Sequence, residues 1–438
     1  MIEVRHVARV QLPEDENIKA LILNLFAYTS RSGESFHNYS YKDGVAYLPP
    51  CLPKLEVVAS LLNETVVDNR SLGQPISSPF ILNPEFTLRD YQVEPARQLF
   101  ENTRDNKSAT LSAGCGTGKT IVVSHAAGRL NKKILGILDQ SNLFQNWAIA
   151  FDIIYGKKIQ QLKSTDIAFS DVCITTFQML HRNPELLERI RKVFGCLILD
   201  ECHVVKAATF KQVLSRLDAQ YRIACTATFF NKNLPLGILE DWLAPVSVKM
   251  VDQDALTPEI RWIDTGVIWA SEEPMDYASY VLPALAADAK RNAVIFSILK
   301  QCLEEKRRTI VCCITVKQAN FLHEIMIKSG ARSTVYTGST TAKRDLEVKT
   351  KMNSGELDFI FASMKFNKGT DIDTADCMVL VRPNNNLKDT QQLTGRVVRK
   401  VEGKPKPIVY DFADVGYLAE IFVRNRKKFY RSLNYEEG

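Results

Sequence analysis

The residues with the clearest chemical potential form a glycine-rich stretch, Ala113-Gly114-Cys115-Gly116-Thr117-Gly118-Lys119-Thr120. Glycines allow backbone N–H groups to turn toward an anion without Cβ clashes. A helix that follows such a turn adds the positive end of its dipole. We expect Lys119 to reach the β- and γ-phosphates of a nucleoside triphosphate, and the Thr120 hydroxyl to hold Mg²⁺.

The sequence on either side supports this interpretation. An apolar run, Ala109–Ala113, precedes the glycines, and a helix-like run, Ile121–Leu130, follows them. Strand, turn and helix in this order are the setting of a phosphate-binding loop. Ala113 stands where the strict pattern has glycine. The alternative is a glycine-rich turn before an ordinary helix.

Two acids follow a second apolar run, which spans Cys196–Leu199 and leads into Asp200 and Glu201. In a parallel sheet, the last side chains of a strand project at the ligand crevice. We expect Asp200 to bind Mg²⁺, and Glu201 to orient or deprotonate the attacking water. The alternative is a helix N-cap, but the pair begins 81 residues after Lys119, a separation typical of a nucleotide site.

The composition is that of an ordinary globular protein. The 438 residues are 45% hydrophobic and 24% charged, and at ~150 residues per domain this length predicts about three domains. The net charge of +6 weakly favours a polyanionic partner. Residues 1–83 hold seven Lys/Arg and nine Asp/Glu, a net −2, so the remainder carries +8. Any nucleic-acid path should therefore lie mainly on the later part of the chain.

The ten cysteines contain no C-x-x-C pair and no His/Cys cluster at zinc spacing. Five lie in apolar, strand-like runs, namely Cys173, Cys196, Cys225, Cys312 and Cys313. We interpret them as small core residues in a reducing compartment. The start of the chain is not signal-like, and no apolar run of ~18 residues occurs, so we expect a soluble cytoplasmic protein.

Residues 1–83 are expected to form a small α+β domain that ends in a linker. Alternating apolar residues from Ile2 to Leu12 predict a half-buried strand, and helical spacing follows from Ile18 to Leu25. Two strand-like runs flank Lys42-Asp43-Gly44, which is a hairpin signal. A second helix is expected from Leu55 to Leu62, and the polar residues 65–84 are typical of a linker. Nucleic-acid contact and plain strand packing are both open for Tyr39, Tyr41, Tyr47 and Lys42.

Two further domains are expected at residues 84–245 and 246–438, because apolar strands alternate with helical patterns in both. Such alternation implies a parallel sheet with helices on both faces. The expected strands are Ala109–Ala113, Ile134–Leu138, Val172–Thr176, Cys196–Leu199, Arg222–Thr226, Thr309–Ile314, Thr334–Tyr336, Phe359–Ala362, Met378–Val381 and Ile408–Tyr410. A helix is expected over Ala284–Lys306.

Asp200-Glu201-Cys202-His203 fits the Asp-Glu-x-His sequence of superfamily 2 helicases, and residues 85 to about 412 resemble that family. Further stretches resemble its motifs in order: Leu88-Arg89-Asp90-Tyr91-Gln92, Gln145-Asn146-Trp147, Thr175-Thr176-Phe177-Gln178, Thr226-Ala227-Thr228, Thr337-Gly338-Ser339, Asn367-Lys368-Gly369-Thr370-Asp371 and Gln392-Leu393-Thr394-Gly395-Arg396-Val397-Val398-Arg399. Asp139-Gln140 departs from the Pro-Thr of many relatives. The resemblance implies an α/β fold, with two RecA-like parallel-sheet domains in tandem after a small α+β domain.

The resemblance also implies a role for each motif, with ATP and Mg²⁺ as cofactors. Catalysis would fall to Lys119, Asp200, Glu201, Gln392, Arg396 and Arg399. ATP would be bound by Arg89, Gln92, Gly369 and Asp371 beside the phosphate loop, with Gln92 on the adenine. His203, Thr226 and Thr228 would couple the ATP and nucleic-acid sites. Nucleic acid would be contacted by Gln145, Thr175, Thr176, Gln178, Thr337, Gly338, Ser339, Lys368 and Thr370.

The arginines of the last motif would reach from the second α/β domain to ATP in the first. Arginine stays charged and can donate two parallel hydrogen bonds to phosphate oxygens, so it stabilises the negative charge of the transition state. Nucleotide binding would then close a cleft and hydrolysis would release it. The alternative for Gly395-Arg396 alone is a surface turn.

The finer resemblance is to the UvsW/XPB-like group, and the layout is similar to that of UvsW-type helicases of T5-type bacteriophages. This implies a monomeric, ATP-dependent DNA helicase that acts on forked, four-way or other branched DNA. Asp-Glu-Cys-His also argues against the RNA-remodelling DEAD-box group. The alternatives are a duplex DNA translocase that does not separate strands, and a DNA-binding scaffold with a vestigial nucleotide site.

Strand separation requires a wedge, and Phe229, Phe230 and Phe366 flank two of the motifs. Exposed aromatics there could stack on a base at the fork, although core packing at the sheet end is the plainer interpretation. A basic segment near the end of the chain could neutralise phosphates or form a solvated helix face. Its residues are Arg424, Arg426, Lys427, Lys428 and Arg431.

Overall fold

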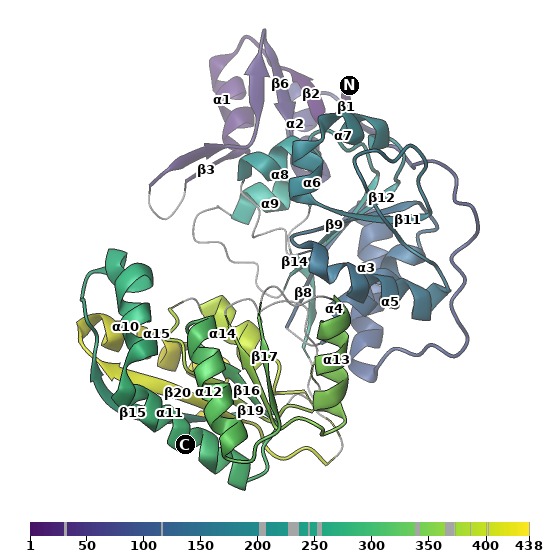
Figure 1. Cartoon of the computed structure of the whole chain (residues 1–438). Coiled ribbons are helices and arrows are strands. Elements are labelled where there is room, and N and C mark those ends of the chain that lie inside the picture. The colour runs from purple at the N-terminus through teal and green to yellow at the C-terminus, as the bar shows by residue number, and fades with distance from the viewer. Residues whose placement is uncertain are drawn as a thin grey trace. The chain divides into compact units, whose positions relative to one another are not determined.

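The computed structural model describes residues 1–438 except 30–32, 115–116, 201–206, 227–235, 244–245, 252–255, 338–341, 364–371, 373, 386, 400, 402 and 438. The chain divides into two compact units, Met1–Asp252 and Gln253–Gly438 (Figure 1). The first unit holds a small N-terminal sheet and a seven-stranded parallel sheet, and the second holds another seven-stranded parallel sheet. In the part of the chain that the structure describes, no helix is long and apolar enough to cross a membrane.

The N-terminal α+β region is a five-stranded sheet in the order β5-β6-β2-β1-β7, packed on two helices. Its elements are β1 (Ile2–Val4), β2 (Ala8–Gln11), α1 (Glu16–Asn24), β5 (Ser40–Lys42), β6 (Val45–Leu48), α2 (Leu52–Leu62) and β7 (Val66–Asp68). A separate ribbon pairs β3 (Ala27–Thr29) with β4 (Ser35–His37). Buried Ile22, Leu55 and Val58 form the core with Val4 and Val10 of the sheet, as the apolar spacing predicts.

The predicted hairpin is present between β5 and β6, which pair antiparallel. Its turn residues Asp43 and Gly44 have φ angles of 52° and 78°. Positive φ at both central positions is the type I′ geometry, which matches the twist of the flanking strands. Tyr39 packs against the small core, whereas Tyr41 is 45% exposed.

The first parallel sheet has the order β10-β11-β9-β12-β13-β8-β14. Its strands are β8 (Ser108–Ala113), β9 (Ile134–Leu138), β10 (Gln160–Gln161), β11 (Val172–Thr176), β12 (Cys196–Asp200), β13 (Tyr221–Thr226) and β14 (Val246–Met250). Its helices are α3 (Asp90–Asn106), α4 (Lys119–Gly128), α5 (Phe144–Tyr155), α6 (Phe177–Arg182), α7 (Pro184–Ile190), α8 (Ala207–Leu214) and α9 (Leu236–Trp242). The five strands predicted for this region are all present.

Helices cover both faces of this sheet because its strands alternate between two apolar cores. Leu135 and Ile137 of β9 face the core that α6, α7, α8 and α9 complete. Ile134 and Leu138 of the same strand face the core of α3, α4 and α5. Burial on both faces explains why these strands read as continuous apolar runs.

The segment that follows the small sheet is not a bare linker. Residues 66–68 form β7, which pairs in parallel with β1. Further on, Ser71 N–H donates to the Asp218 carbonyl at 2.9 Å and the Ser71 carbonyl accepts from Gln220 N–H at 2.9 Å. Both Ser77 N–H and Ser77 Oγ donate to Asp171, at 2.7 and 2.6 Å. These bonds fasten the segment to the parallel sheet, which polar composition alone does not reveal.

The N-terminal region is also joined to the parallel-sheet region around one buried carboxylate, Asp241 in α9. Tyr28 Oη and Asn38 Nδ2 donate to Asp241 Oδ2 at 2.6 and 2.8 Å. Lys54 Nζ lies 2.7 Å from Asp241 Oδ1. Trp242 Nε1 donates to Asn38 Oδ1 at 3.0 Å. Three side chains of the N-terminal region and two of α9 thus hold the two regions in one unit.

The second unit has the sheet order β17-β18-β16-β19-β20-β15-β21. Its strands are β15 (Glu259–Ile268), β16 (Thr309–Cys312), β17 (Ser333–Tyr336), β18 (Phe359–Ala362), β19 (Cys377–Leu380), β20 (Ile408–Val415) and β21 (Glu436–Glu437). Its helices are α10 (Leu282–Ala287), α11 (Ala289–Glu304), α12 (Val316–Lys328), α13 (Ala342–Asn353), α14 (Leu387–Thr394) and α15 (Tyr417–Ser432). The single helix expected over 284–306 is divided into α10 and α11, because Asp288 is extended and caps α11 by accepting from Arg291 N–H.

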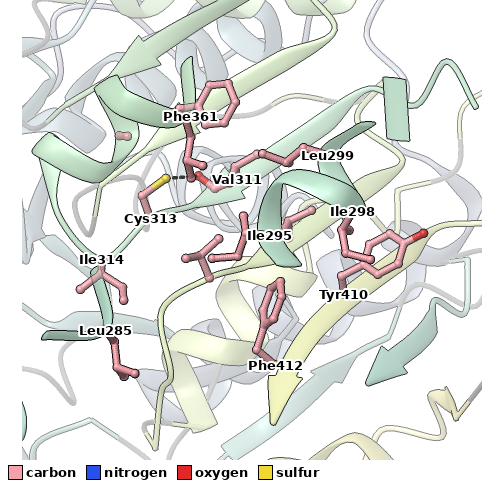
Figure 2. Close-up of a cluster of buried hydrophobic side chains, with 14 of the residues drawn as sticks. Leu285, Ile295, Ile298, Leu299, Val311, Cys313, Ile314, Phe361, Tyr410 and Phe412 are labelled. Carbon is pink, nitrogen blue, oxygen red and sulfur yellow. Dashed lines mark hydrogen bonds between the residues drawn. The ribbon is translucent and has the colours of Figure 1, made fainter. Parts of the chain in front are cut away.

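Two apolar cores again lie on the two faces of this sheet. Figure 2 shows the larger one, where side chains of α10 and α11 meet those of β16, β18 and β20. The residues labelled there are Leu285, Ile295, Ile298, Leu299, Val311, Cys313, Ile314, Phe361, Tyr410 and Phe412. The opposite core takes the alternate strand residues, such as Ile310 and Ile360, with Val348 and Met352 of α13. All five cysteines expected in the cores are buried as free thiols.

Candidate nucleotide-binding site and nucleic-acid interface

Three of the predicted motifs meet at one edge of the first parallel sheet. The glycine-rich loop follows β8, Asp200 ends β12, and Thr226 ends β13, which lies between those two strands. Thr226 is in register with Ser112, and Cys225 with Asp200. Because the strands are parallel, their carboxyl ends share one side of the sheet, where ligands bind in such folds.

The described part of the glycine-rich loop is held by α3. The Thr117 carbonyl accepts from Gln92 Nε2 at 2.9 Å and from Tyr91 Oη at 3.2 Å. Within the loop, Thr117 Oγ1 donates to the Gly114 carbonyl at 2.8 Å. Gly118 has a φ of +81°, and a Cβ there would lie 2.3 Å from Gln92 Nε2. Glycine is therefore required at 118 both for its backbone angle and for the approach of Gln92.

The predicted adenine-reading residues have structural roles of their own. Gln92 is 4% exposed, and its Oε1 accepts from Arg89 N–H at 3.1 Å, which caps α3. Arg89 Nη1 donates to Tyr91 Oη at 3.3 Å on the surface. The amide of Gln92 thus links the start of α3 to the loop, and its contact with adenine stays a prediction.

Lys119 and Thr120 are the first two residues of α4, and both are half-buried. The apolar side of this helix, with Val122, Val123 and Ala126, is inside the core, so the first turn is fixed at the sheet edge. A helix N-terminus is a favourable place for an anion. The predicted phosphate ligands Cys115 and Gly116 lie outside the described residues.

Asp200 is oriented by two donors from neighbouring elements. The side chain is 6% exposed. Its Oδ2 accepts from Trp147 Nε1 at 3.2 Å, and its Oδ1 accepts from Cys225 Sγ at 3.4 Å. Trp147 is fully buried in α5. A carboxylate at a strand end next to a phosphate-type loop suits a hard cation such as Mg²⁺, which prefers oxygen ligands.

Sequence reasoning missed Trp147, Tyr91 and Cys225 as parts of this site. Trp147 stood in a motif that we related to nucleic acid, yet its indole points to the proposed metal ligand. The contact depends on how α5 packs over the sheet edge, and no spacing in the sequence encodes it.

Glu201, His203 and Thr228 lie outside the described residues, as do the expected wedge residues Phe229, Phe230 and Phe366.

The predicted nucleic-acid residues of the first unit lie around the ends of β9 and β11. Thr175 and Thr176 are the last residues of β11, and Thr176 Oγ1 accepts from Met179 N–H at 3.2 Å, which caps α6. Gln178 in α6 and Gln145 in the first turn of α5 are exposed. These residues share the carboxyl edge with Asp200, and their contact with nucleic acid stays a prediction.

In the second unit, the arginine motif follows α14 at the carboxyl side of its sheet. Arg396 is 9% exposed. Burial raises the pKa of the Cys312 thiol to about 12, and the nearby Arg396 charge opposes that rise, so the guanidinium is close to the last residue of β16. Thr337, which follows β17, and Arg399 are half-buried. Of the other expected residues, Gly338, Ser339, Lys368, Gly369, Thr370, Asp371 and the Gln392 side chain lie outside the described part.

The basic segment of α15 divides into two faces. Arg426 is not on the surface: its Nε donates to Asp411 Oδ2 at 2.9 Å, and both side chains are 2% exposed. The expectation that Arg426 belongs to an exposed basic face is therefore wrong. The other four basic side chains line an open groove of about 740 Å³ beside the end of β20, namely Arg424, Lys427, Lys428 and Arg431.

The two parallel sheets, each covered by helices on both faces, define a tandem RecA-like protein whose glycine-rich loop follows β8 of the first sheet. Two family models match. "Type III restriction enzyme, res subunit" covers residues 85–231, and "Helicase conserved C-terminal domain" covers residues 292–401.

Similar proteins agree with this class. The probable helicase D10 of Escherichia phage T5 is 22% identical over 348 residues, which are 79% of this chain and 74% of that protein. The XPB helicase/translocase subunit of factor IIH from Danio rerio is 23% identical over 351 residues, 74% of this chain and 44% of that protein. The chain thus spans less than half of the XPB relative. A Saccharomyces cerevisiae Dbp5 structure matches 81% of this chain and 95% of its own with a TM-score of 0.56 at 14% identity, which shows the fold.

The chain belongs to the superfamily 2 helicases, in the UvsW/XPB-like group. It is therefore an enzyme with the ATP-dependent helicase or translocase activity of that family.

Proposed function

We propose that this helicase uses ATP hydrolysis to move on DNA and to unwind or branch-migrate forked and four-way junctions. The observation that carries the motor part is the meeting of the glycine-rich loop, Asp200 and Thr226 at one sheet edge, next to the ends of β9 and β11. The match to the phage helicase over 79% of this chain supports helicase activity, and the choice of branched DNA rests on the resemblance of the motifs to the UvsW/XPB-like group.

In the first unit, Lys119 and the N–H groups at the start of α4 would bind the phosphates of ATP. Asp200, aimed by Trp147 and Cys225, would hold Mg²⁺ together with Thr120. The cation would neutralise charge on the β- and γ-phosphates. Glu201 would orient the attacking water, since it follows Asp200 directly in the sequence.

In the second unit, Arg396 and Arg399 would bind the γ-phosphate as charge develops in the transition state. Arginine groups of this kind accelerate phosphoryl transfer by ~10³–10⁵ in systems where they have been measured. Because the arginines and the loop belong to different units, binding and hydrolysis would alternate between a closed and an open arrangement. That alternation would move the DNA-contacting loops relative to one another.

A duplex translocase that does not part strands is the second candidate. Two comparisons favour this candidate: the XPB relative is described as a helicase/translocase subunit, and residues 85–231 match the restriction-enzyme family model. A scaffold with a vestigial site is disfavoured, because Lys119, Asp200 and Arg396 are all present.

Strand displacement separates these candidates. Fluorescent forked, four-way and blunt duplexes would be mixed with ATP, with an RNA duplex and the Lys119→Ala variant as controls. The proposal expects ATP-dependent release of strands from forked and four-way DNA by the wild type. ATP hydrolysis on every DNA without strand release would establish the translocase instead, and no DNA-stimulated hydrolysis at all would leave the scaffold.

A further inference from the structure

A small cavity opens between the two predicted nucleic-acid loops of the first unit. It has a volume of about 210 Å³ and lies at the carboxyl ends of β9 and β11. Phe144, Leu162 and Met179 supply apolar walls, and Ser141, Thr175 and Thr176 supply hydroxyl groups. The proposed ATP chemistry uses none of these six side chains.

Thr175 is a lining residue whose hydroxyl group is not satisfied by hydrogen bonds within the described structure. The residue is 4% exposed, and its Oγ1 has no hydrogen-bond partner among the described residues. A buried polar group without a partner destabilises the fold, because it has lost its hydrogen bonds to water. Its neighbour Thr176 differs, because its hydroxyl caps α6 through Met179 N–H. Thr175 lines the cavity, so a ligand there that draws the buried hydroxyl toward itself by a turn about χ1 would supply the partner that it lacks.

The chemistry of the walls selects the kind of ligand. Among the described residues, no charged side chain lines the cavity. A phosphate would need cations or several N–H donors, whereas a flat, neutral group with a hydrogen-bonding edge suits an apolar wall with hydroxyls. Water occupies roughly 30 Å³ per molecule in the liquid, so the volume of the cavity equals that of about seven water molecules. That is the scale of one nucleobase and not of a whole nucleotide.

We propose that this cavity receives a single nucleobase, turned out of the DNA strand that the loops after β9 and β11 bind. The base contacts the Phe144 ring and Met179, and its edge exchanges a hydrogen bond with Thr175 Oγ1. Contact between a base and an aromatic ring strengthens binding and is tolerant of sequence, because every base has a π-face. The inference rests on the proposed function, because it requires this edge of the unit to face DNA. A base held here resists sliding of the strand between steps.

The test is equilibrium binding of a fluorescent single-stranded oligonucleotide at several salt concentrations. The variants are Thr175→Val, which removes the hydroxyl, and Met179→Phe, which narrows the cavity. The matched control is Thr103→Val in α3, where a buried hydroxyl donates to the Leu99 carbonyl at 2.6 Å. Both cavity variants should bind about 3–10-fold more weakly than wild type, with an unchanged slope of log affinity against log salt, because neither substitution removes a charge.

Replacing bases by abasic sites, one position at a time, completes the test. At one position the abasic site should weaken binding by the wild type but not by Thr175→Val or Met179→Phe, because the contact is already gone. Equal weakening of all three proteins at every position would overturn the base pocket. Wild type that binds no DNA would defeat the proposed function as well, so the two failures are distinguishable.

Discussion

At the scale of single residues, the proposed Mg²⁺ site depends on how firmly the Asp200 carboxylate is held in position. Trp147 N–H and Cys225 S–H each hold one carboxylate oxygen. Removal of a residue that hydrogen-bonds a metal-ligating side chain typically lowers metal affinity or activity by about 10–100-fold. Trp147 also belongs to α5, whose first turn carries the exposed Gln145. One helix therefore joins a predicted DNA contact to a predicted metal ligand.

Trp147→Phe tests this role because it keeps a ring in the core and deletes the N–H. We expect the Mg²⁺ concentration for half-maximal ATP hydrolysis to rise about tenfold or more. Trp242→Phe is the matched control, since Trp242 is also buried and its N–H donates to Asn38. An unchanged Mg²⁺ requirement in Trp147→Phe, or the same rise in both variants, would refute the positioning role.

Lys119→Ala addresses the phosphate loop directly. Removal of a single preorganised charge-stabilising group typically lowers a rate by roughly 10²–10³-fold, and we expect DNA-stimulated ATP hydrolysis to fall at least this far. Phosphate release measured with and without DNA provides the readout, with Lys107→Ala at the end of α3 as the control. Hydrolysis at the wild-type rate would remove Lys119 from the mechanism.

At the scale of elements, α4 carries a half-buried titratable group, His125. Burial, and secondarily the Arg129 charge, lowers the pKa of His125 to about 4. In the unfolded chain its pKa is near 6.5. Below that pH the unfolded chain takes up a proton that the folded chain refuses, so folding stability falls as the pH drops from about 6.5 to about 4.

His125→Leu should remove this part of the pH dependence. Urea unfolding at pH 7.5 and pH 5 measures it, and the exposed His181→Gln in α6 serves as the control. We expect the stability lost between the two pH values to be smaller in His125→Leu than in wild type and in His181→Gln. Identical losses in all three proteins would contradict the assignment.

The two faces of α15 predict different outcomes for two arginines of one helix. Arg426→Met leaves Asp411 buried and unpaired, which typically costs about 3–5 kcal/mol; Tyr430 Oη still donates to it at 2.8 Å. Arg424→Met removes an exposed charge and should change stability by about 0.5 kcal/mol or less. Denaturant midpoints of the second unit compare them, and an Asp411→Asn change should rescue Arg426→Met in part. Equal midpoints in the two single variants would contradict this division.

The same helix shows where sequence reasoning succeeds and where it stops. Strands such as β9 and β11 were predictable to the residue because apolar runs bounded by polar turns have one plausible register. The burial of Arg426 was not predictable, because its partner Asp411 lies in β20, far away in the sequence. A run of basic residues does not by itself show which of them face the core and which face solvent. The glycine-rich loop and Asp200 could be recognised from local spacing, whereas the Gln92 and Trp147 contacts arise from packing between distant elements.

At the scale of the whole molecule, the proposed mechanism requires groups from both units to act on one nucleotide. The first unit carries the phosphate loop and Asp200, and the second carries Arg396 near the carboxyl end of β16. Neither sheet has both halves of the chemistry in its described residues. If the units act together, loss of the arginine must stop hydrolysis while leaving ATP binding to the first unit intact.

ATP hydrolysis by Arg396→Ala, measured beside its ATP and DNA affinities, tests this claim most directly. Arg332→Ala, an exposed arginine of the same unit that pairs with Asp358, is the control. The account predicts affinities within about threefold of wild type and a hydrolysis rate lower by ~10³ or more. Hydrolysis by Arg396→Ala at the rate of the Arg332→Ala control would contradict it.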